Sequence, residues 1–166
     1  MTEKAKYYIE KLMLQKHPEG GYFKEIYRAG EIIEADLLPG RYGGDRSFST
    51  SIYFLLDENQ VSKFHKLKSD EIWHFYDGSA IKIYIIHPDG TLEEKLLGNK
   101  LEDGETLQTV IGKGNWFGAE LVEKNKYGLI GCTVAPGFDF NDFEMGDREK
   151  LLTLFPLHSE FIKKLS

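Results

Sequence analysis

The stretch FHKLKSDEIWHFYDG, residues 64–78, contains the pattern that decides the fold. VSKFHKL (61–67) and EIWHFY (71–76) carry apolar side chains at the alternating spacing of strands, and the turn-forming sequences KSD and DGS follow them. Similar short strands, separated by turns with Gly, Asp or Asn, continue from residue 47 to residue 136. This spacing predicts an all-β sandwich or barrel.

Both ends of the chain differ from this strand-rich middle. Near the N-terminus, Tyr8 and Leu12 fall on one face of a predicted helix, which a His-Pro pair and two glycines end. The C-terminal segment DREKLLTLFPLHSEFIKKL returns to helical spacing, with one interruption at its proline. The prediction is a single domain over residues 1–166, with a barrel core at about residues 21–140.

Composition excludes several classes of partner. The 166 residues carry a net charge of −6 and no block of clustered Lys or Arg, which argues against binding a nucleic acid polymer. No apolar run has the length of a membrane span, and the charged start of the chain does not resemble a signal peptide. The single cysteine, Cys132, lies in an apolar strand and is interpreted as a core residue. These features predict a cytoplasmic protein without a membrane partner.

The opening stretch also resembles the first of two paired motifs of the cupin superfamily. That motif commonly has the form H-x-H, three or four residues, E, six residues, G. His65, Glu71 and Gly78 match it here, whereas Leu67 stands at the second histidine. The resemblance therefore implies an incomplete set of the ligands with which many cupins bind a metal.

The second cupin motif, P-x-G-x-x-H, is weaker in this chain. The segment GKGNWF keeps the glycine, Gly114, but places Phe117 at the histidine. The resemblance implies a single cupin jelly-roll β-barrel with an N-terminal helix and a C-terminal helical segment. Nearly the whole chain is similar to a small cupin family of uncharacterised proteins often labelled predicted sugar epimerases, through the blocks HPEGGYFKEIYRA, STSIYFLL, FHKLKSDEIWHFYDG, GNWFGAEL and APGFDFNDFEMGDREKLL.

A metal cofactor is not favoured by these residues. Cupin metals usually take three histidines and one carboxylate, and only His65 and Glu71 remain at matching positions. His74 cannot replace a lost ligand, because side chains alternate along a strand and it falls on the face opposite to Glu71. A divalent metal held by His65 and Glu71 is left open as the alternative. His17, beside the glycine pair, either lines the mouth of the barrel or, as the favoured interpretation, terminates the helix.

Candidate catalytic residues follow from the epimerase resemblance, in which a base removes a proton next to a carbonyl and an acid returns one. His65 suits the role of base, and Glu71 either orients it or acts as the base itself, with its pKa raised by an apolar barrel. Tyr53, in the middle of a strand, is the candidate acid. Ser51 shares its face, and Lys63 shares a face with His65, where it is placed either to stabilise an enolate or in solvent.

The remaining candidates would bind the ligand. Arg28 and Arg46 are either clamps for a carboxylate or phosphate group or ordinary surface residues. Four aromatic residues on the predicted strands offer rings on which a sugar or base could stack, with core packing as the alternative: Trp73, Phe75, Trp116 and Phe117.

Three functions remain open from the sequence. The first is a metal-independent epimerase or isomerase for a sugar or nucleotide-sugar, using His65 and Glu71. The second is a cupin that binds a small ligand without catalysis, and the third is a metal-dependent cupin enzyme. The resemblance also implies a homodimer formed through the N-terminal strand GYFKEIYR, which could extend the sheet of a second copy.

Overall fold

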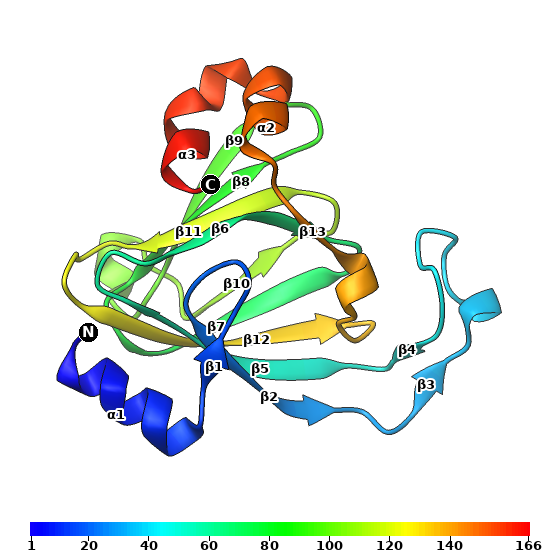
Figure 1. The fold of residues 1–166 in the computed structure, drawn as a ribbon, viewed down its shortest axis with the longest axis horizontal. Coiled ribbons are helices and arrows are strands. Elements are labelled where there is room, and N and C mark those ends of the chain that lie inside the picture. Colours follow the sequence, from blue (N-terminus) through cyan, green and yellow to red (C-terminus); the bar gives the residue numbers. More distant parts are fainter.

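The computed structural model describes residues 1–166 as two antiparallel sheets that face each other, with short helices outside them (Figure 1). One sheet has six strands, in the order β1 (Gln15–Lys16), β2 (Tyr22–Arg28), β5 (Thr50–Asp57), β12 (Tyr127–Ala135), β7 (Asp70–Gly78) and β10 (Gln108–Ile111). The other has five, in the order β13 (Phe143–Met145), β6 (Val61–Leu67), β11 (Trp116–Leu121), β8 (Ile81–Ile86) and β9 (Leu92–Leu97).

Short elements complete the chain. The two-stranded pair of β3 (Ile32–Ile33) and β4 (Arg46–Ser47) projects from one end of the sheets, as Figure 1 shows. The α-helices are α1 (Glu3–Leu12), α2 (Arg148–Leu154) and α3 (Ser159–Lys164). The 3-10 turns are η1 (Ala35–Leu37), η2 (Leu101–Asp103), η3 (Phe140–Asp142) and η4 (Pro156–His158). The predicted all-β jelly roll with helical ends is confirmed. None of the helices has the length and apolar character needed to cross a bilayer.

The main core lies between the two sheets, and each sheet is also covered on its outer face. Phe54, Trp73, Phe117 and Ile130 are nearly inaccessible to solvent in the central cluster. Helix α1 packs on the outside of the six-stranded sheet, whereas α2 and α3 pack on the outside of the five-stranded sheet. Full burial of one such side chain contributes roughly 1.5–3 kcal/mol, so the double-sided packing makes these strands rigid supports.

A β-bulge interrupts the pairing of β6 with β11. Phe117 lies opposite His65, but two residues further along β11, Ala119 lies opposite Ser62, three residues away on β6. The extra residue on β6 changes which side chains face inward. Ser62 and His65 are both buried, whereas Lys63 is exposed. Of the two positions left open for Lys63, the structure shows the one in solvent, because the alternation of side chains is broken within the strand.

A tight turn after β1 directs the chain back toward the sheets. Gly20 has a φ of +115°, and a Cβ there would come within 2.2 Å of the Val61 carbonyl oxygen. Gly21 has a φ of +69°, and a Cβ there would come within 2.6 Å of the Leu55 carbonyl oxygen on β5. Only glycine tolerates this conformation and approach, so the pair fixes the preceding residues 17–19 over the end of β6.

One long edge of the six-stranded sheet is only partly covered. The two-residue strand β1 pairs with Tyr22 and Phe23, so the rest of β2 has no neighbour on that side. Ile26 and Tyr27 on this part of β2 are exposed. The edge is available for a second copy of the chain, and the homodimer stays a prediction.

Candidate functional site

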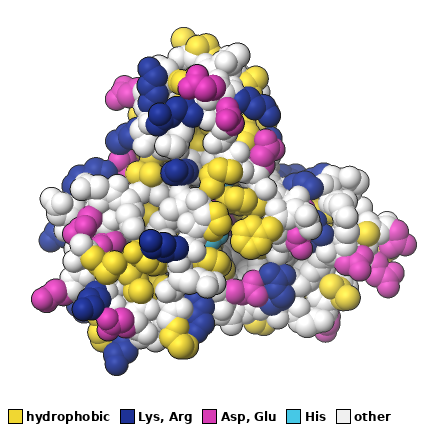
Figure 2. Space-filling view, viewed as in Figure 1, with side chains coloured by type: hydrophobic (Ala, Val, Ile, Leu, Met, Phe, Trp, Pro, Cys, Tyr) yellow, Lys and Arg dark blue, Asp and Glu magenta, His cyan; other side chains and the backbone are white.

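A cavity of about 160 Å³ opens between the two sheets at the end where β2, β5 and β13 lie. Figure 2 shows a histidine near the centre of the molecule, recessed among hydrophobic side chains. The walls combine aromatic rings with titratable groups. The lining residues are His17, Glu19, Phe23, Glu25, Arg28, Thr50, Ile52, Phe54, His65, Leu67, Glu71, Trp73, Cys132, Val134, Phe138, Asp139, Phe140 and Phe143.

The deepest polar contact joins His65 on β6 to Glu19 in the turn after β1. Glu19 Oε2 lies 3.1 Å from His65 Nε2, and Ser62 donates a hydrogen bond of 2.7 Å from its hydroxyl group to Glu19 Oε1. The other ring nitrogen, His65 Nδ1, lies 2.6 Å from the carbonyl oxygen of Lys63. Both nitrogens of His65 are therefore occupied within the protein.

These contacts fix where the protons lie. A carbonyl oxygen only accepts, so His65 Nδ1 carries a proton and, in the neutral ring, Nε2 has the lone pair. Burial lowers the pKa of His65, against opposing effects of the Lys63 carbonyl and Glu71, and burial raises the pKa of Glu19. A protonated Glu19 donating to neutral His65 satisfies all of these conditions without placing a charge in the interior.

His17 is a second neutral histidine in the cavity wall. The backbone N–H of Glu19 donates to His17 Nδ1 over 3.3 Å, so that atom holds a lone pair and the proton of the neutral ring is on Nε2. Burial lowers its pKa, with Glu19 opposing this. Its ring packs edge-on against Phe23, with centroids 4.5 Å apart. The helix-terminating role predicted for His17 is wrong: α1 ends at Leu12, and His17 lines the cavity.

Glu71 and Trp73, on β7, supply the unsatisfied polar atoms of the site. Both side chains line the cavity, and neither Glu71 Oε2 nor Trp73 Nε1 has a hydrogen-bond partner of good geometry, although the Trp73 indole and the Cys132 thiol lie close enough to the Glu71 carboxyl group to lower its pKa. Burial raises the pKa of Glu71 to about 7, an effect that nearby His65 partly offsets. Buried polar atoms without partners are uncommon in folded proteins and cost free energy, so two of them in one cavity wall indicate a place for a ligand.

Cys132, on β12, lies behind this pair. It is buried, and burial together with the neighbouring Glu71 and Glu19 raises the pKa of its thiol well above the usual range. The thiol is therefore protonated and unreactive at neutral pH, in agreement with its interpretation as a core residue, although it also lines the cavity.

Strand β5 presents a different face to the cavity from the one predicted. Thr50, Ile52 and Phe54 line the cavity, so the alternating residues Ser51 and Tyr53 point away from it. Tyr53 packs toward α1 and lies edge-on to Tyr76. Its predicted role as the acid is inconsistent with this position, and so is ligand binding by Ser51.

The predicted aromatic residues divide between the cavity and the core. Trp73 lines the cavity, and Phe117 packs against the ring of His65 with centroids 4.1 Å apart. Phe75 packs at the edge of the central core. Trp116 belongs to the cluster under α2 and α3, on the outer face of its sheet. Phe75, Trp116 and Phe117 are therefore core residues, as the alternative interpretation held, and none of the three lines the cavity.

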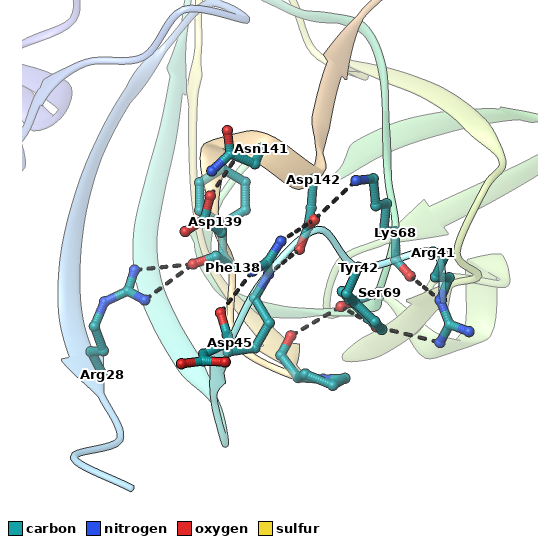
Figure 3. Close-up of polar contacts among 12 residues, drawn as sticks. Arg28, Arg41, Tyr42, Asp45, Lys68, Ser69, Phe138, Asp139, Asn141 and Asp142 are labelled. Atoms are coloured by element: carbon teal, nitrogen blue, oxygen red, sulfur yellow. Dashed lines mark hydrogen bonds and ion pairs between the residues drawn. The ribbon is translucent and has the colours of Figure 1, made fainter. Parts of the chain in front are cut away.

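The two predicted arginine clamps also differ. Arg28 lies at the cavity mouth, where it pairs with Glu25 at 2.7 Å and donates to the carbonyl oxygen of Phe138. Arg46 is buried and makes two hydrogen bonds of 2.6 Å to the carboxylate of Asp142 (Figure 3). Since both oxygens of that carboxylate are taken, Arg46 fixes the segment around η3 and is not available to a ligand in the cavity.

The donor set does not fit a metal ion. Leu67 lines the cavity and Phe117 is buried, each at a position where the cupin motifs have a histidine, and neither has a donor atom. Both nitrogens of His65 are engaged, and no three His, Cys, Asp or Glu side chains converge in a ligand geometry. We therefore derive no step of the chemistry through a metal.

The sequence did not identify Glu19, which is central to the site. Its only signal is the block HPEGG, whose glycines also fit the end of a helix. A glycine pair beside a histidine and a glutamate also fits a close backbone approach that places both side chains in a cavity.

Comparison with known proteins identifies the family. Residues 6–146 match the model of the family described as Cupin superfamily (DUF985). The chain belongs to the cupin superfamily. An uncharacterised protein of Saccharomyces cerevisiae is 32% identical over 143 residues, which cover 81% of this chain and 71% of the yeast protein.

Solved structures support the same placement. A crystal structure of a protein from Shewanella oneidensis is 37% identical, with a TM-score of 0.89, and covers 100% of this cupin and 98% of its own chain. A hypothetical protein from Leishmania major is 31% identical, with a TM-score of 0.87 and 98% coverage of both chains. Oxalate decarboxylase of Bacillus subtilis, at 16% identity and a TM-score of 0.55 over 91% of this chain and 37% of its own, shares the fold alone.

Proposed function

We propose that this cupin is a metal-independent isomerase that moves a proton between adjacent carbon atoms of a small, uncharged sugar. The observation that carries the proposal is the pair of unpartnered atoms, Glu71 Oε2 and Trp73 Nε1, in the wall of one cavity. One is an acceptor that can take a proton, and the other is a donor that can hold an oxygen atom of the ligand.

Glu71 supplies the base. A carboxyl group with a pKa of about 7 is ionised in half of the molecules at neutral pH, and it is basic enough to remove a proton next to a carbonyl group. His65, the base favoured by the sequence, is less suitable because Lys63 and Glu19 occupy both of its nitrogens. In this mechanism His65 and Glu19 form a neutral, hydrogen-bonded support for the cavity wall.

The reaction keeps atoms and electrons in balance. Glu71 takes a proton from the carbon next to the carbonyl, and the electron pair of that bond moves toward the carbonyl oxygen, to which Trp73 Nε1–H donates. The hydroxyl group on that carbon passes its proton to the former carbonyl oxygen and becomes the new carbonyl group. Glu71 returns the first proton to the former carbonyl carbon. This return uses one face of the sugar. Epimerisation needs a second group on the opposite face, and Tyr53, the candidate for that role, points away from the cavity.

Charge and size favour a free sugar over a nucleotide-sugar. Of the four carboxyl groups that line the cavity, Glu19 is protonated and Glu25 pairs with Arg28, the single permanent cation, so Asp139 and the ionised form of Glu71 leave the cavity with a net negative charge. A diphosphate would meet repulsion here. The volume of about 160 Å³ is close to that of an engineered cavity of about 150 Å³ that holds benzene. A ring of six atoms fits such a space, and its hydroxyl groups can extend toward the mouth.

Hydrogen exchange into deuterated water tests the function. A panel of aldoses and ketoses is incubated with the protein, and proton NMR follows loss of the signal at the carbon next to the carbonyl. The rate should rise with pH as Glu71 ionises, around pH 7. Glu71→Gln should lower the rate by about 10²–10⁴-fold, which is the usual contribution of a general base.

Glu25→Gln is the matched control, since it makes the same chemical change in a residue of the same cavity. It should keep most of the exchange activity. Equal rates in Glu71→Gln and the unmodified protein would contradict the mechanism. Saturable sugar binding without any exchange would favour the non-catalytic binding cupin instead.

A further inference from the structure

A second, larger depression lies on the other side of the wall formed by β6 and β13. Leu67 and Phe143, which pair across these strands, line both the cavity and this groove. The groove has a volume of about 580 Å³. Most of the residues around it are polar or charged: Arg41, Lys66, Leu67, Lys68, Lys113, Gly114, Asn141, Asp142, Phe143 and Glu144.

Four cations line the groove, and not all of them are neutralised. Lys66 pairs with Glu144 at 2.9 Å, and Lys113 has a long contact of 3.9 Å with Asp70. Lys68 lies 3.4 Å from Asp142, but Arg46 already binds both oxygens of that carboxylate. The charge of Lys68 is therefore largely in surplus.

Arg41 adds a second surplus charge at the same place. It has no carboxylate partner: its Nε donates to the carbonyl oxygen of Lys68, and its guanidinium stacks over the ring of Tyr42 at 4.7 Å. Figure 3 shows Arg41 and Lys68 on neighbouring segments beside Asp142. Tyr42 is itself buried and held by a hydrogen bond to Ser69, so the guanidinium rests on a fixed support. Two like charges are thus held together in a concave site of a protein with a net charge of −6.

We propose that this groove binds a phosphoryl group of a small molecule, with Arg41 and Lys68 as its main contacts. A phosphate dianion neutralises both surplus charges, and its oxygens can meet a planar guanidinium and an ammonium group together. A single carboxylate offers one charge and two oxygens. The groove is separate from the sugar cavity, so the inference does not rest on the proposed isomerase activity.

Isothermal titration calorimetry with pyrophosphate as the probe tests the site. The unmodified protein should show one saturable site whose affinity falls as salt concentration rises. Arg41→Gln combined with Lys68→Met should weaken binding by about tenfold or more, because hydrogen bonds to charged groups are lost. Arg41 is exposed and Lys68 is partly exposed, so both substitutions should be tolerated, and a thermal unfolding curve checks this for each variant.

Lys82→Met is the matched control. The side chain of Lys82 has an exposed fraction of 33%, close to the 36% of Lys68, and it pairs with Glu94 outside the groove. It should leave pyrophosphate affinity unchanged. An equal loss in Lys82→Met would show general attraction and overturn the site, as would absence of saturable binding. Citrate binding as tight as that of pyrophosphate would overturn the assignment to a phosphoryl group.

Discussion

Asp142 and Glu71 are two buried carboxyl groups that lie on different sides of the wall formed by β6 and β13, and their surroundings are opposite. Asp142 accepts two short hydrogen bonds from Arg46 and has Lys68 as a second cation. Glu71 has one oxygen without any partner and a pKa raised to about 7. Burial alone does not distinguish them, since both are less than 10% exposed.

This difference distinguishes a carboxyl group that stabilises the fold from one that is free to bind a ligand. A buried carboxylate with a bidentate arginine is ionised, satisfied and fixed, so it can hold a segment in place but has no capacity left for a ligand. A buried carboxyl group without partners destabilises the empty protein and gains its hydrogen bonds only when a ligand arrives. The segment that Asp142 fixes carries Phe140 and Phe143 to the mouth of the cavity that Glu71 lines.

The largest expected effect is on stability, at Asp142. Asp142→Asn leaves the guanidinium of Arg46 buried without its counter-charge, which should lower the free energy of unfolding by about 3–5 kcal/mol. Urea denaturation measures the change. Glu144→Gln, the same type of change at an exposed pair, should cost no more than about 1 kcal/mol. Equal effects of the two substitutions would show that the buried pair does not anchor the segment.

The second prediction concerns the pH dependence of stability at Glu71. Its pKa is about 7 in the folded protein against 4.5 as the model value, so between these pH values the folded state binds more protons than the unfolded state. Stability from this group is therefore lost as pH rises through about 7, by as much as ~3 kcal/mol. Below about pH 4.5, the free energies of unfolding of Glu71→Gln and the unmodified protein should change with pH in the same way. Above about pH 7, Glu71→Gln should be more stable relative to the unmodified protein than it is at low pH.

Denaturation of both proteins across this range measures the difference. The titration of the other histidines is common to both proteins, whereas His65, whose pKa Glu71 raises, is affected by the substitution and forms part of the measured difference. Glu25→Gln, the same chemical change at the cavity mouth, is measured beside it as the control for the substitution itself. A constant difference between Glu71→Gln and the unmodified protein at all pH values would mean that Glu71 is not perturbed by burial.

The comparison also shows what the sequence could predict. The strands and turns of residues 47–136, and the shared face of Glu71 and Trp73, follow from local alternation, whereas His65 and Glu71 were placed inside by their match to the cupin motif. Local alternation does not show which face of β5 points toward the cavity. Both of its faces are covered, one by the second sheet and one by α1, so apolar residues occur on both and nothing local shows that Tyr53 points outward.

Contacts between residues that lie far apart in the sequence could not be predicted either. Glu19 meets Ser62 and His65 only because the Gly20 turn brings the chain across the end of β6. The partner of Arg46, Asp142, is 96 residues away in the sequence. Nothing local shows this pair, so Arg46 could only be interpreted as a ligand clamp or a surface residue. The bulge that turns Lys63 outward adds one residue without any marker in the sequence. The types of side chain indicated which chemistry is possible in the cavity. Contacts between distant segments determine which of these side chains have no protein partner and can bind a ligand.

The smallest expected effect is at Lys68, where the two regions meet. Because Arg46 already satisfies Asp142, removing the second cation with Lys68→Met should change the free energy of unfolding by no more than about 1 kcal/mol, as for other partly exposed pairs. Urea denaturation beside Asp142→Asn provides the comparison. A loss as large as that of Asp142→Asn would mean that Lys68 belongs to the structural ion pair, and its charge would then not be free for the groove.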